Sequence, residues 1–422
     1  MAMNRSQNWP ETTLRSICNP TQIWNPQKDK RDEFWYVDVS AVSRESLSIR
    51  NPQLVKASKA PSRARKIIKT GDTIFATIRP TLRRIAFVDK QFDNQIASTA
   101  FCVVRPNTDA AVPRFLYYLL QTDRLNEEIA KFESGANYPA VNDKDILDRT
   151  IELPSRPEQE KIATALWKIQ RAIETEEKLI ATARELKRST MHQLFTHGLR
   201  AEPQRETEIG MIPETWEVVP LGRYLLLAQY GLSIRGQQVG RYPILRMNCQ
   251  LGGKTIFRDL QFVDIDQKTF VAFQIKDGDL LFNRTNSFEL VGRTSIFRSG
   301  REAVFASYLI RLTLDQSEYY PEFVNFYFNQ PSVQADLKRL ASRGVSQSNI
   351  SASKLKEYYI PKTSLDEQRE ISGILQSVDR KIEIHERKRT ALQELFKTML
   401  HKLMTAEIRV ADLDIDVSEI ES

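Results

Sequence analysis

Two long stretches of the chain carry apolar side chains at alternating spacings of three and four residues. They run from about residue 157 to 196 and from about 365 to 405, and neither has a proline in its interior. This spacing places the apolar residues on one stripe of an α-helix, as in coiled coils. The seam positions are Ile162, Leu166, Ile169, Ile173, Ile180, Leu186 and Leu194 in the first stretch and Ile371, Leu375, Val378, Ile382, Leu392, Met399 and Leu403 in the second.

A helix of about 40 residues is roughly 60 Å long. A compact domain on one side of such a helix cannot bury a stripe of that length. We therefore predict that the two helices pack against each other. The alternative is that each helix belongs separately to the core of its own domain.

A mixed segment precedes each long helix. Short apolar runs predict strands over 74–78, 100–104, 280–282 and 304–312. Runs that begin with proline predict helices over 113–120 and 321–328, because proline is favoured in the first helical turn.

The chain is an internal repeat with an offset of 207 to 209 residues. The landmarks that occur twice are Trp9 and Trp216, Leu14 and Leu221, Gly71-Asp72 and Gly278-Asp279, Phe75 and Phe282, Gly135 and Gly344, and Glu158-Gln159 and Glu367-Gln368. A period this long indicates two similar domains in tandem and not a solenoid.

The repeat predicts an order of segments. These are a first mixed domain (1–156), a long helix (157–197), a linker (198–215), a second mixed domain (216–364), a second long helix (365–405) and an acidic tail (406–422). The helical halves resemble each other more closely than the mixed halves do. We therefore expect two copies of one partner at the helices and two different ligands at the mixed domains.

Charge suggests the kind of ligand. The net charge is +7, and residues 50–84 hold ten lysines and arginines against one acid, Asp72. Such a stretch can neutralise phosphates, although a solvated basic loop would have the same composition. The candidate DNA-binding residues here are Lys56, Lys59, Arg63, Arg65, Lys66, Lys69, Arg79, Arg83 and Arg84.

Polar residues follow the second Gly-Asp pair and surround the late glycine of each repeat. Arginine and asparagine suit the edges of guanine and adenine, and serine and threonine suit phosphates. The candidates are Asn283, Arg284, Thr285, Asn286, Ser287 and Arg293, with Asn137 and Tyr138 near Gly135 and Arg343, Ser346, Gln347 and Ser348 near Gly344. Plain turns are the alternative for the two glycine loops.

Catalytic chemistry is sparse in the sequence. All four histidines lie in or just after the long helices, and the three cysteines are scattered. We expect no metal site, no histidine-based triad and no cofactor in this chain. No apolar run is long enough to span a membrane, and the N-terminus lacks the apolar core of a signal peptide, so a soluble cytoplasmic protein is expected.

The ordered motifs resemble those of the specificity subunits of type I restriction-modification enzymes. The motifs are Trp-x4-Leu, Gly-Asp-x-(Ile/Leu)-Phe, a glycine loop, (Ile/Leu)-Pro and then Glu-Gln-x2-Ile, and they occur twice between Trp9 and Leu403. The first repeat departs from the second after its Gly-Asp pair, where Ile78-Arg79-Pro80 stands without a counterpart of Arg284-Thr285.

The resemblance implies an α+β fold with two similar α/β target-recognition domains, separated by two long helices that form an antiparallel coiled coil with pseudo-twofold symmetry. It implies a non-catalytic subunit that reads a bipartite, asymmetric target in double-stranded DNA. Two methyltransferase subunits would supply S-adenosylmethionine, and restriction subunits would use ATP. The alternatives are a protein-only coiled-coil scaffold or adaptor and a standalone nuclease.

Overall fold

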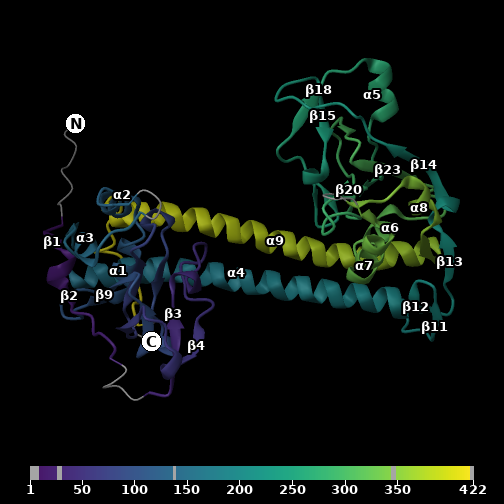
Figure 1. Cartoon of the computed structure of the whole chain (residues 1–422). Helices are drawn as coiled ribbons and strands as arrows, with labels where there is room; N and C mark the ends of the chain where they lie inside the picture. The colour runs from purple at the N-terminus through teal and green to yellow at the C-terminus, as the bar shows by residue number, and fades with distance from the viewer. Residues whose placement is uncertain (1–8, 26–30, 136–138, 344–347, 419–422) are drawn as a thin grey trace. The chain divides into compact units, whose positions relative to one another are not determined.

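A computed structural model describes residues 9–25, 31–135, 139–343 and 348–418. The chain forms two compact units (Figure 1). Unit 1 comprises Met1–Glu177 and Arg387–Ser422, and unit 2 comprises Lys178–Glu386. Each unit therefore holds one mixed domain with parts of both long helices, and the division between the units crosses both helices.

Unit 1 has two main sheets. The first has the order β2-β9-β6-β7 and the second β4-β3-β8-β5, while β1 pairs with β10. The bounds are β1 Glu11–Thr13, β2 Cys18–Asn19, β3 Glu33–Val37, β4 Gln53–Lys56, β5 Ala64–Ile68, β6 Thr73–Ala76, β7 Ile85–Phe87, β8 Gln95–Ser98, β9 Phe101–Pro106 and β10 Thr150–Glu152. Its short helices are α1 Pro113–Leu119, α2 Asp123–Ala130 and α3 Asp143–Leu147.

Unit 2 contains sheets of order β14-β23-β19-β21-β17-β16, β18-β15-β22 and β20-β25-β24, and the pairs β13-β26 and β11-β12. The bounds are β11 Gln204–Thr207, β12 Gly210–Pro213, β13 Glu217–Pro220, β14 Leu225–Tyr230, β15 Tyr242–Leu245, β16 Gln250–Leu251, β17 Lys254–Thr255, β18 Gln261–Val263, β19 Leu280–Asn283, β20 Thr285–Asn286, β21 Thr294–Ile296, β22 Val304–Phe305, β23 Leu309–Leu314, β24 Ser342–Arg343, β25 Ser348–Asn349 and β26 Tyr359–Lys362. Its short helices are α5 Gln267–Phe273, α6 Pro321–Phe328, α7 Pro331–Leu340 and α8 Ala352–Glu357.

The predicted repeat is confirmed by the strand topology. The order β2-β9-β6-β7 in unit 1 matches β14-β23-β19-β21 in unit 2. In the second sheets, β3 runs parallel to β8 and antiparallel to β4, just as β15 runs parallel to β22 and antiparallel to β18. The mixed halves thus share a backbone frame, and unit 2 extends one sheet with the hairpin β16-β17.

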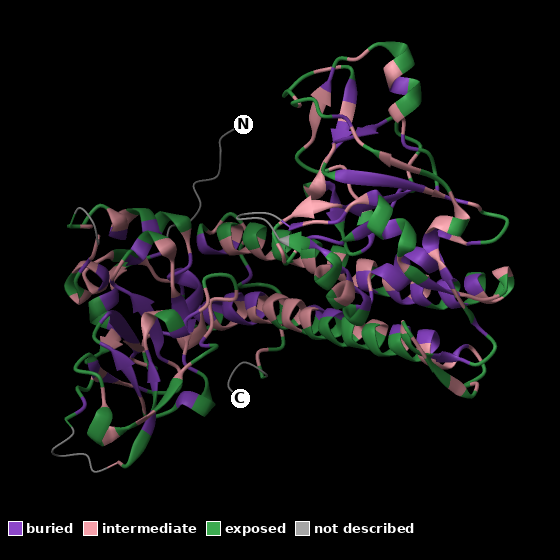
Figure 2. Ribbon diagram, turned by 45° about the vertical axis from the view of Figure 1, so that its right-hand side comes forward, coloured by how far each residue is buried: buried purple, intermediate pink, exposed green. Residues whose placement is uncertain are grey.

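The strands of the mixed domains and their short helices, α1 and α6 above all, form the buried interior, whereas much of each long helix is exposed or half-buried (Figure 2). One predicted strand is wrong in extent. Residues 304–312 form β22 and β23 with a turn between them, in which the Leu309 N–H donates to Ala306 O at 2.9 Å. The apolar run continues because the chain passes directly from one sheet into another.

The long helices are α4, Arg156–His197, and α9, Leu365–Met404, close to the predicted bounds. In unit 1 the start of α4, with Ile162 and Leu166, shares a core cluster with Met399 and Leu403 at the end of α9. In unit 2 the end of α4 shares a cluster with Ile371 and Leu375 at the start of α9. The helices therefore pack antiparallel within each unit, as predicted.

The seam is partly polar. Glu176 is buried and forms an ion pair with Lys388 at 2.6 Å. Lys187 pairs with Asp379 at 2.7 Å and takes the place in the seam that the sequence analysis gave to Leu186, which is 53% exposed. The assignment of Leu186 is wrong because the helical phase places its neighbour on the inner face, where the long aliphatic stem of lysine substitutes for leucine.

A joint between the ends of the mixed domain and the long helix explains the Trp and Glu-Gln landmarks. In unit 1 the Trp9 Nε1–H donates to Glu158 Oε2 at 3.2 Å. Gln159 Oε1 accepts the Val112 N–H at 2.8 Å, and its Nε2 donates to Pro154 O at 3.0 Å. These buried side chains hold the start of α4 against the first and last parts of the domain.

The same joint recurs in unit 2. The Trp216 Nε1–H donates to Glu367 Oε2 at 3.1 Å. Gln368 Oε1 accepts the Tyr320 N–H at 2.8 Å, and its Nε2 donates to Thr363 O at 2.8 Å. The repeated motif is thus architectural.

The linker and the described part of the acidic tail, up to residue 418, both contact the rest of the chain. The linker contains the hairpin β11-β12, in which Ile212 is buried. The acidic tail returns to α4 within unit 1, where the Arg409 guanidinium binds both Glu158 oxygens at 2.6 and 2.9 Å and Val410 is buried. The tail therefore completes the unit 1 joint.

Candidate nucleic-acid interface

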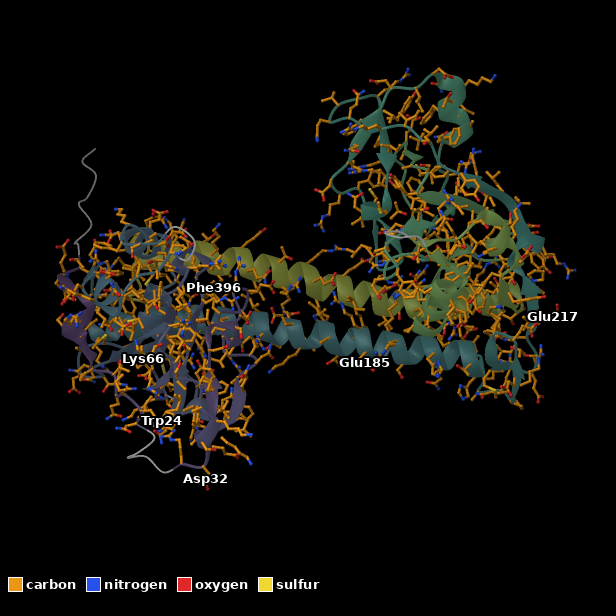
Figure 3. The ribbon with its side chains drawn as sticks, viewed as in Figure 1. Trp24, Asp32, Lys66, Glu185, Glu217 and Phe396 are labelled. Atoms are coloured by element: carbon orange, nitrogen blue, oxygen red, sulfur yellow. The ribbon has the colours of Figure 1, made fainter. Side chains whose placement is uncertain are left out.

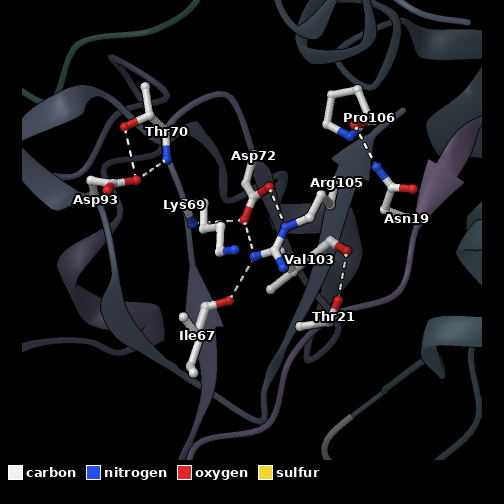
Figure 4. A network of polar contacts seen from close by, with 10 residues as sticks. All are labelled: Asn19, Thr21, Ile67, Lys69, Thr70, Asp72, Asp93, Val103, Arg105 and Pro106. Carbon is white, nitrogen blue, oxygen red and sulfur yellow. Dashed lines mark hydrogen bonds and ion pairs between the residues drawn. The ribbon is translucent and has the colours of Figure 1, made fainter. Parts of the chain in front are cut away.

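The Gly-Asp pairs build the turns that lead into β6 and β19. Gly71 and Gly278 both have φ of +88°, a region that glycine occupies without steric cost. In each turn the aspartate accepts a backbone N–H three residues earlier at 2.8 Å. Figure 4 shows Asp72 also accepting Arg105 Nε and Nη2, at 2.9 and 2.7 Å. Burial raises the pKa of Asp72, and the Arg105 pair offsets only part of this rise.

In unit 2 the polar residues after β19 lie beside those near the late glycine. We call the sheet β20-β25-β24 the unit 2 ladder. It pairs Thr285 with Asn349, and Asn286 with Ser348, which in turn pairs with Arg343. The structure thus brings together two of the segments that the sequence analysis singled out separately.

Arg284 precedes this ladder and is held on three sides. Its Nη2 donates to Asn349 Oδ1 at 3.2 Å, its Nη1 donates to Ser307 O at 3.4 Å, and its guanidinium lies 4.6 Å from the centre of the Tyr230 ring. Tyr230 was missed from the sequence, since nothing in the strand pattern of β14 marks that ring as the platform for an arginine.

Exposure separates the other candidates of unit 2. Ser287 and Arg293 are exposed, and Thr285 and Asn286 are half-buried. Asn283 is only 1% exposed, and Ser348 is also buried. The prediction of these two as surface contacts is wrong, because β19 is an inner strand that is buried along its whole length and Ser348 is the buried residue of β25.

Unit 1 contains the same backbone arrangement with different side chains. Ile78 bridges Ala140, which also bridges Ser134, and the Arg79 N–H donates to Pro139 O at 2.7 Å. We call the segments around these three bridged residues the unit 1 ladder. It corresponds to β20, β25 and β24.

Matching hydrogen bonds fix the correspondence residue by residue. The Thr77 N–H donates to Ala100 O at 2.8 Å and its carbonyl accepts the Val141 N–H at 2.9 Å; Arg284 makes the equivalent bonds, at 3.0 and 2.9 Å. Thr77 therefore stands where unit 2 has Arg284, and Arg79 stands where unit 2 has Asn286. The departure noted in the sequence is a change of side chains on one frame.

Part of the predicted site lies outside the described residues. These are Asn137, Tyr138, Ser346 and Gln347. The backbone of Arg343 belongs to β24.

The basic stretch of unit 1 divides by exposure. Exposed cations are Lys56, Lys59, Arg63, Lys69 and Arg79, and Arg65 is half-buried. Lys66, labelled in Figure 3, is only 7% exposed. Its Nζ donates to Phe101 O at 2.6 Å and pairs with Asp143 at 2.5 Å. The prediction that Lys66 contacts DNA is wrong, because the alternation along β5 points this side chain into the domain.

Arg84 is also committed to the protein itself. Its Nη1 donates to Val39 O at 2.8 Å and to Val42 O at 2.7 Å. The predicted role of Arg84 as a DNA contact is therefore corrected to that of a positioning residue, because its guanidinium already holds the turn over 39–42. Arg83 next to it pairs with Asp123 at 2.5 Å and remains 41% exposed.

The described residues contain neither a candidate metal site nor a candidate membrane span. No group of three or more histidine, cysteine, aspartate or glutamate side chains within 9–25, 31–135, 139–343 and 348–418 could hold a metal ion. None of the helices that the structure describes combines the length and apolarity needed to cross a lipid bilayer.

The chain is similar to known proteins in both sequence and structure. The family model of the type I restriction modification DNA specificity domain matches residues 8–185 and 213–394. The putative type I restriction enzyme MjaX specificity subunit of Methanocaldococcus jannaschii is 32% identical over 213 residues, 49% of each chain. The MjaVIII specificity subunit of the same organism is 25% identical over 70% of this chain and 71% of its own. The chain thus spans about half of the first relative.

Solved structures agree in fold. A chain from a structural study of complex assembly and conformational transition of the type I R-M system matches with a TM-score of 0.56 and 25% identity, covering 96% of this chain and all of that one. The type I restriction-modification S subunit from M. genitalium matches with a TM-score of 0.58 at 16% identity, covering 96% and 98%. With both mixed domains and both long helices accounted for, this chain belongs to the type I restriction-modification DNA specificity family, as two copies of the domain in tandem.

Proposed function

We propose that the chain is the DNA-recognition subunit of a type I restriction-modification complex and that its two mixed domains each read one element of a bipartite, asymmetric target. The observation that carries this proposal is the pair of ladders, which share a backbone frame but present Arg79 in unit 1 where unit 2 presents Asn286. Arginine suits guanine and asparagine suits adenine, so one frame with different side chains is a means of reading two different sequences.

The helices fit a role in assembly. Two methyltransferase subunits would dock on similar surfaces of the two repeats, and restriction subunits would join them. S-adenosylmethionine and ATP would be bound by those partners, and this chain would contribute recognition without catalysis. Such a complex would act in the cytoplasm, where the DNA of a bacterial or archaeal cell lies.

The proposal is tested by mapping methylated adenines across the genome in cells that carry or lack this gene. We expect methylation at a split target with two unrelated elements, present only with the gene. A scaffold without DNA specificity would leave the methylation pattern unchanged, and a standalone nuclease would cleave DNA without the partner subunits.

Salt gives the first physical prediction. The exposed cations of both units would displace counterions from DNA, so log Kd should rise linearly with log salt, with a slope of about 0.9 per phosphate contacted. Fluorescence anisotropy of a labelled target duplex with the full complex, between 50 and 300 mM salt, measures this slope. A flat dependence would contradict a DNA ligand.

Arg284→Ala gives a second prediction. It removes the guanidinium that lies between Tyr230 and the unit 2 ladder, and we expect about 10- to 100-fold weaker binding to the target. Preference within the element read by unit 2 should relax, while preference within the other element stays.

The matched control for this variant is Arg258→Ala. Arg258 is 71% exposed and pairs only weakly with its neighbour Asp259, at 3.3 Å. It removes the same charge from unit 2 outside the ladder. Equal losses in both variants would show that Arg284 contributes only net charge.

A further inference from the structure

The turn after β6 in unit 1 can be compared with the turn after β19 in unit 2. After β6 the chain turns back, and the last residue of that strand donates its N–H to Arg84 O at 2.9 Å. After β19 the last residue of the strand donates its N–H to Arg293 O at 2.8 Å. Arg84 and Arg293 therefore correspond. The residues just before them, Arg83 and Gly292, end turns of different build: the Gly292 N–H donates to Asn283 O at 2.9 Å, whereas the Arg83 N–H donates to Pro80 O.

Both residues have a left-handed backbone. Gly292 has φ of +88°, and Arg83 has φ of +49°. Glycine adopts such a conformation freely, whereas a residue with a Cβ is strained in it. Unit 1 thus has an arginine in a left-handed conformation directly before Arg84, whereas unit 2 has a glycine directly before Arg293. Strain of this kind is typical of functional positions.

The short turn that holds Arg83 is itself well fixed. It spans Pro80–Leu82, and the Arg83 N–H donates to Pro80 O at 2.8 Å. Arg79 on its other side is also left-handed, with φ of +50°. The side chains of Arg79 and Arg83 therefore project from the two ends of a short, hydrogen-bonded turn.

A groove of about 650 Å³ lies beside this turn, entirely within unit 1. Its lining includes Arg44, Thr81, Arg83 and Arg84, with Glu45 as its one acid. Arg84 builds the wall by holding the carbonyls of the opposite turn. The groove thus combines excess positive charge with a hydroxyl, which is the chemistry that binds a phosphodiester.

The present partner of Arg83 is replaceable. Asp123 pairs with it at 2.5 Å, but the two side chains are 41% and 65% exposed. Ion pairs this exposed contribute little to stability, and a phosphate oxygen offers the same charge to the same guanidinium.

We infer that this groove binds a backbone phosphate of the DNA element read by unit 1, with Arg83 as the donor that exchanges Asp123 for the phosphate. Arg84 acts as the positioning residue. The inference rests on the proposed function and assigns to this groove affinity without base selection.

Arg83→Gly is the direct test, because glycine suits the backbone there and any change reports the side chain. We expect the full complex to bind its target duplex about tenfold more weakly, the salt slope to fall by about 1, and base preference in both elements to stay. Arg124→Ala is the matched control: it removes one charge next to Asp123, but Arg124 is held by Glu152 at 2.9 Å, and we expect wild-type binding.

Asp123→Asn is a second test, and the single variant remains informative even if Arg83→Gly folds poorly. Releasing Arg83 from its carboxylate should tighten binding several-fold, and this gain should vanish in the Asp123→Asn/Arg83→Gly double variant. Suppose that the wild-type complex shows a steep salt slope but that Arg83→Gly or Asp123→Asn leaves its affinity unchanged. That result would overturn this inference and leave the proposed function standing. A wild-type complex with no salt dependence would overturn the proposed function. Altered base preference in Arg83→Gly would instead make Arg83 a base reader and refute the phosphate assignment.

Discussion

Inserting four residues into both long helices, after Glu177 in α4 and after Glu386 in α9, should abolish methylation at the original target and move it to one with a longer gap. Four residues add about 6 Å to each helix, which corresponds to roughly two base pairs of duplex. The result is expected because the helix pair would set the distance between the two elements that are read together.

The insertion needs two companions. Seven residues at the same points keep the heptad phase and should lengthen the gap by roughly three base pairs. Four residues in α4 alone put its seam out of step with α9 and should reduce binding to every gap. Methylation mapped on a plasmid library of targets with gaps of different length measures all three. An unchanged gap in the double insertions would show that the helices do not determine the spacing.

Gln368→Leu should destabilise unit 2 by about 3–5 kcal/mol. Gln368 is fully buried, and besides Tyr320 and Thr363 it binds Glu318 O at 3.0 Å. Leucine has a similar volume but leaves the part-buried Tyr320 N–H and Thr363 O without this partner, at about 1–3 kcal/mol each, and Glu318 O keeps only Lys362 Nζ, at 2.7 Å. Hydrogen exchange of the full chain should show faster exchange in unit 2 and wild-type exchange in unit 1.

Gln159→Leu is the counterpart and should shift the loss of protection to unit 1. Gln393→Leu, at an exposed position of α9, should leave both units within about 0.5 kcal/mol of wild type. If the Gln368 and Gln393 variants behaved alike, the joint would not be what holds the domain to the helix.

The long helices and the repeat were predictable because both depend on periodicity, which a sequence displays directly. The residues of the joint stood out in the sequence only because their spacing recurs in both repeats. Trp9 and Glu158 are 149 residues apart, and the local sequence around either residue does not predict their contact. The broken strand at residues 304–312 was not predictable, because both halves are apolar and only their partners differ.

Charge patterns predicted the basic character of the site, but they did not predict which of its residues are free of structural roles and exposed to a ligand. Lys66, Arg84 and their neighbours look alike in the sequence. Strand phase buries Lys66, and the carbonyls of Val39 and Val42 engage Arg84. Such assignments depend on long-range partners, so a run of cations identifies a surface without telling contacts from supports.

The joint has a consequence for how such genes can change. Its side chains lie at the two ends of each mixed domain, at Trp9 and Glu158-Gln159 in one and at Trp216 and Glu367-Gln368 in the other. The residues between those anchors can be exchanged for the matching segment of a homologous gene without changing the long helices α4 and α9. Recombination within the shared helix sequences would then combine two target elements in a new pair in one step. Under the proposed function, the complex would gain a new DNA specificity without an accumulation of point mutations.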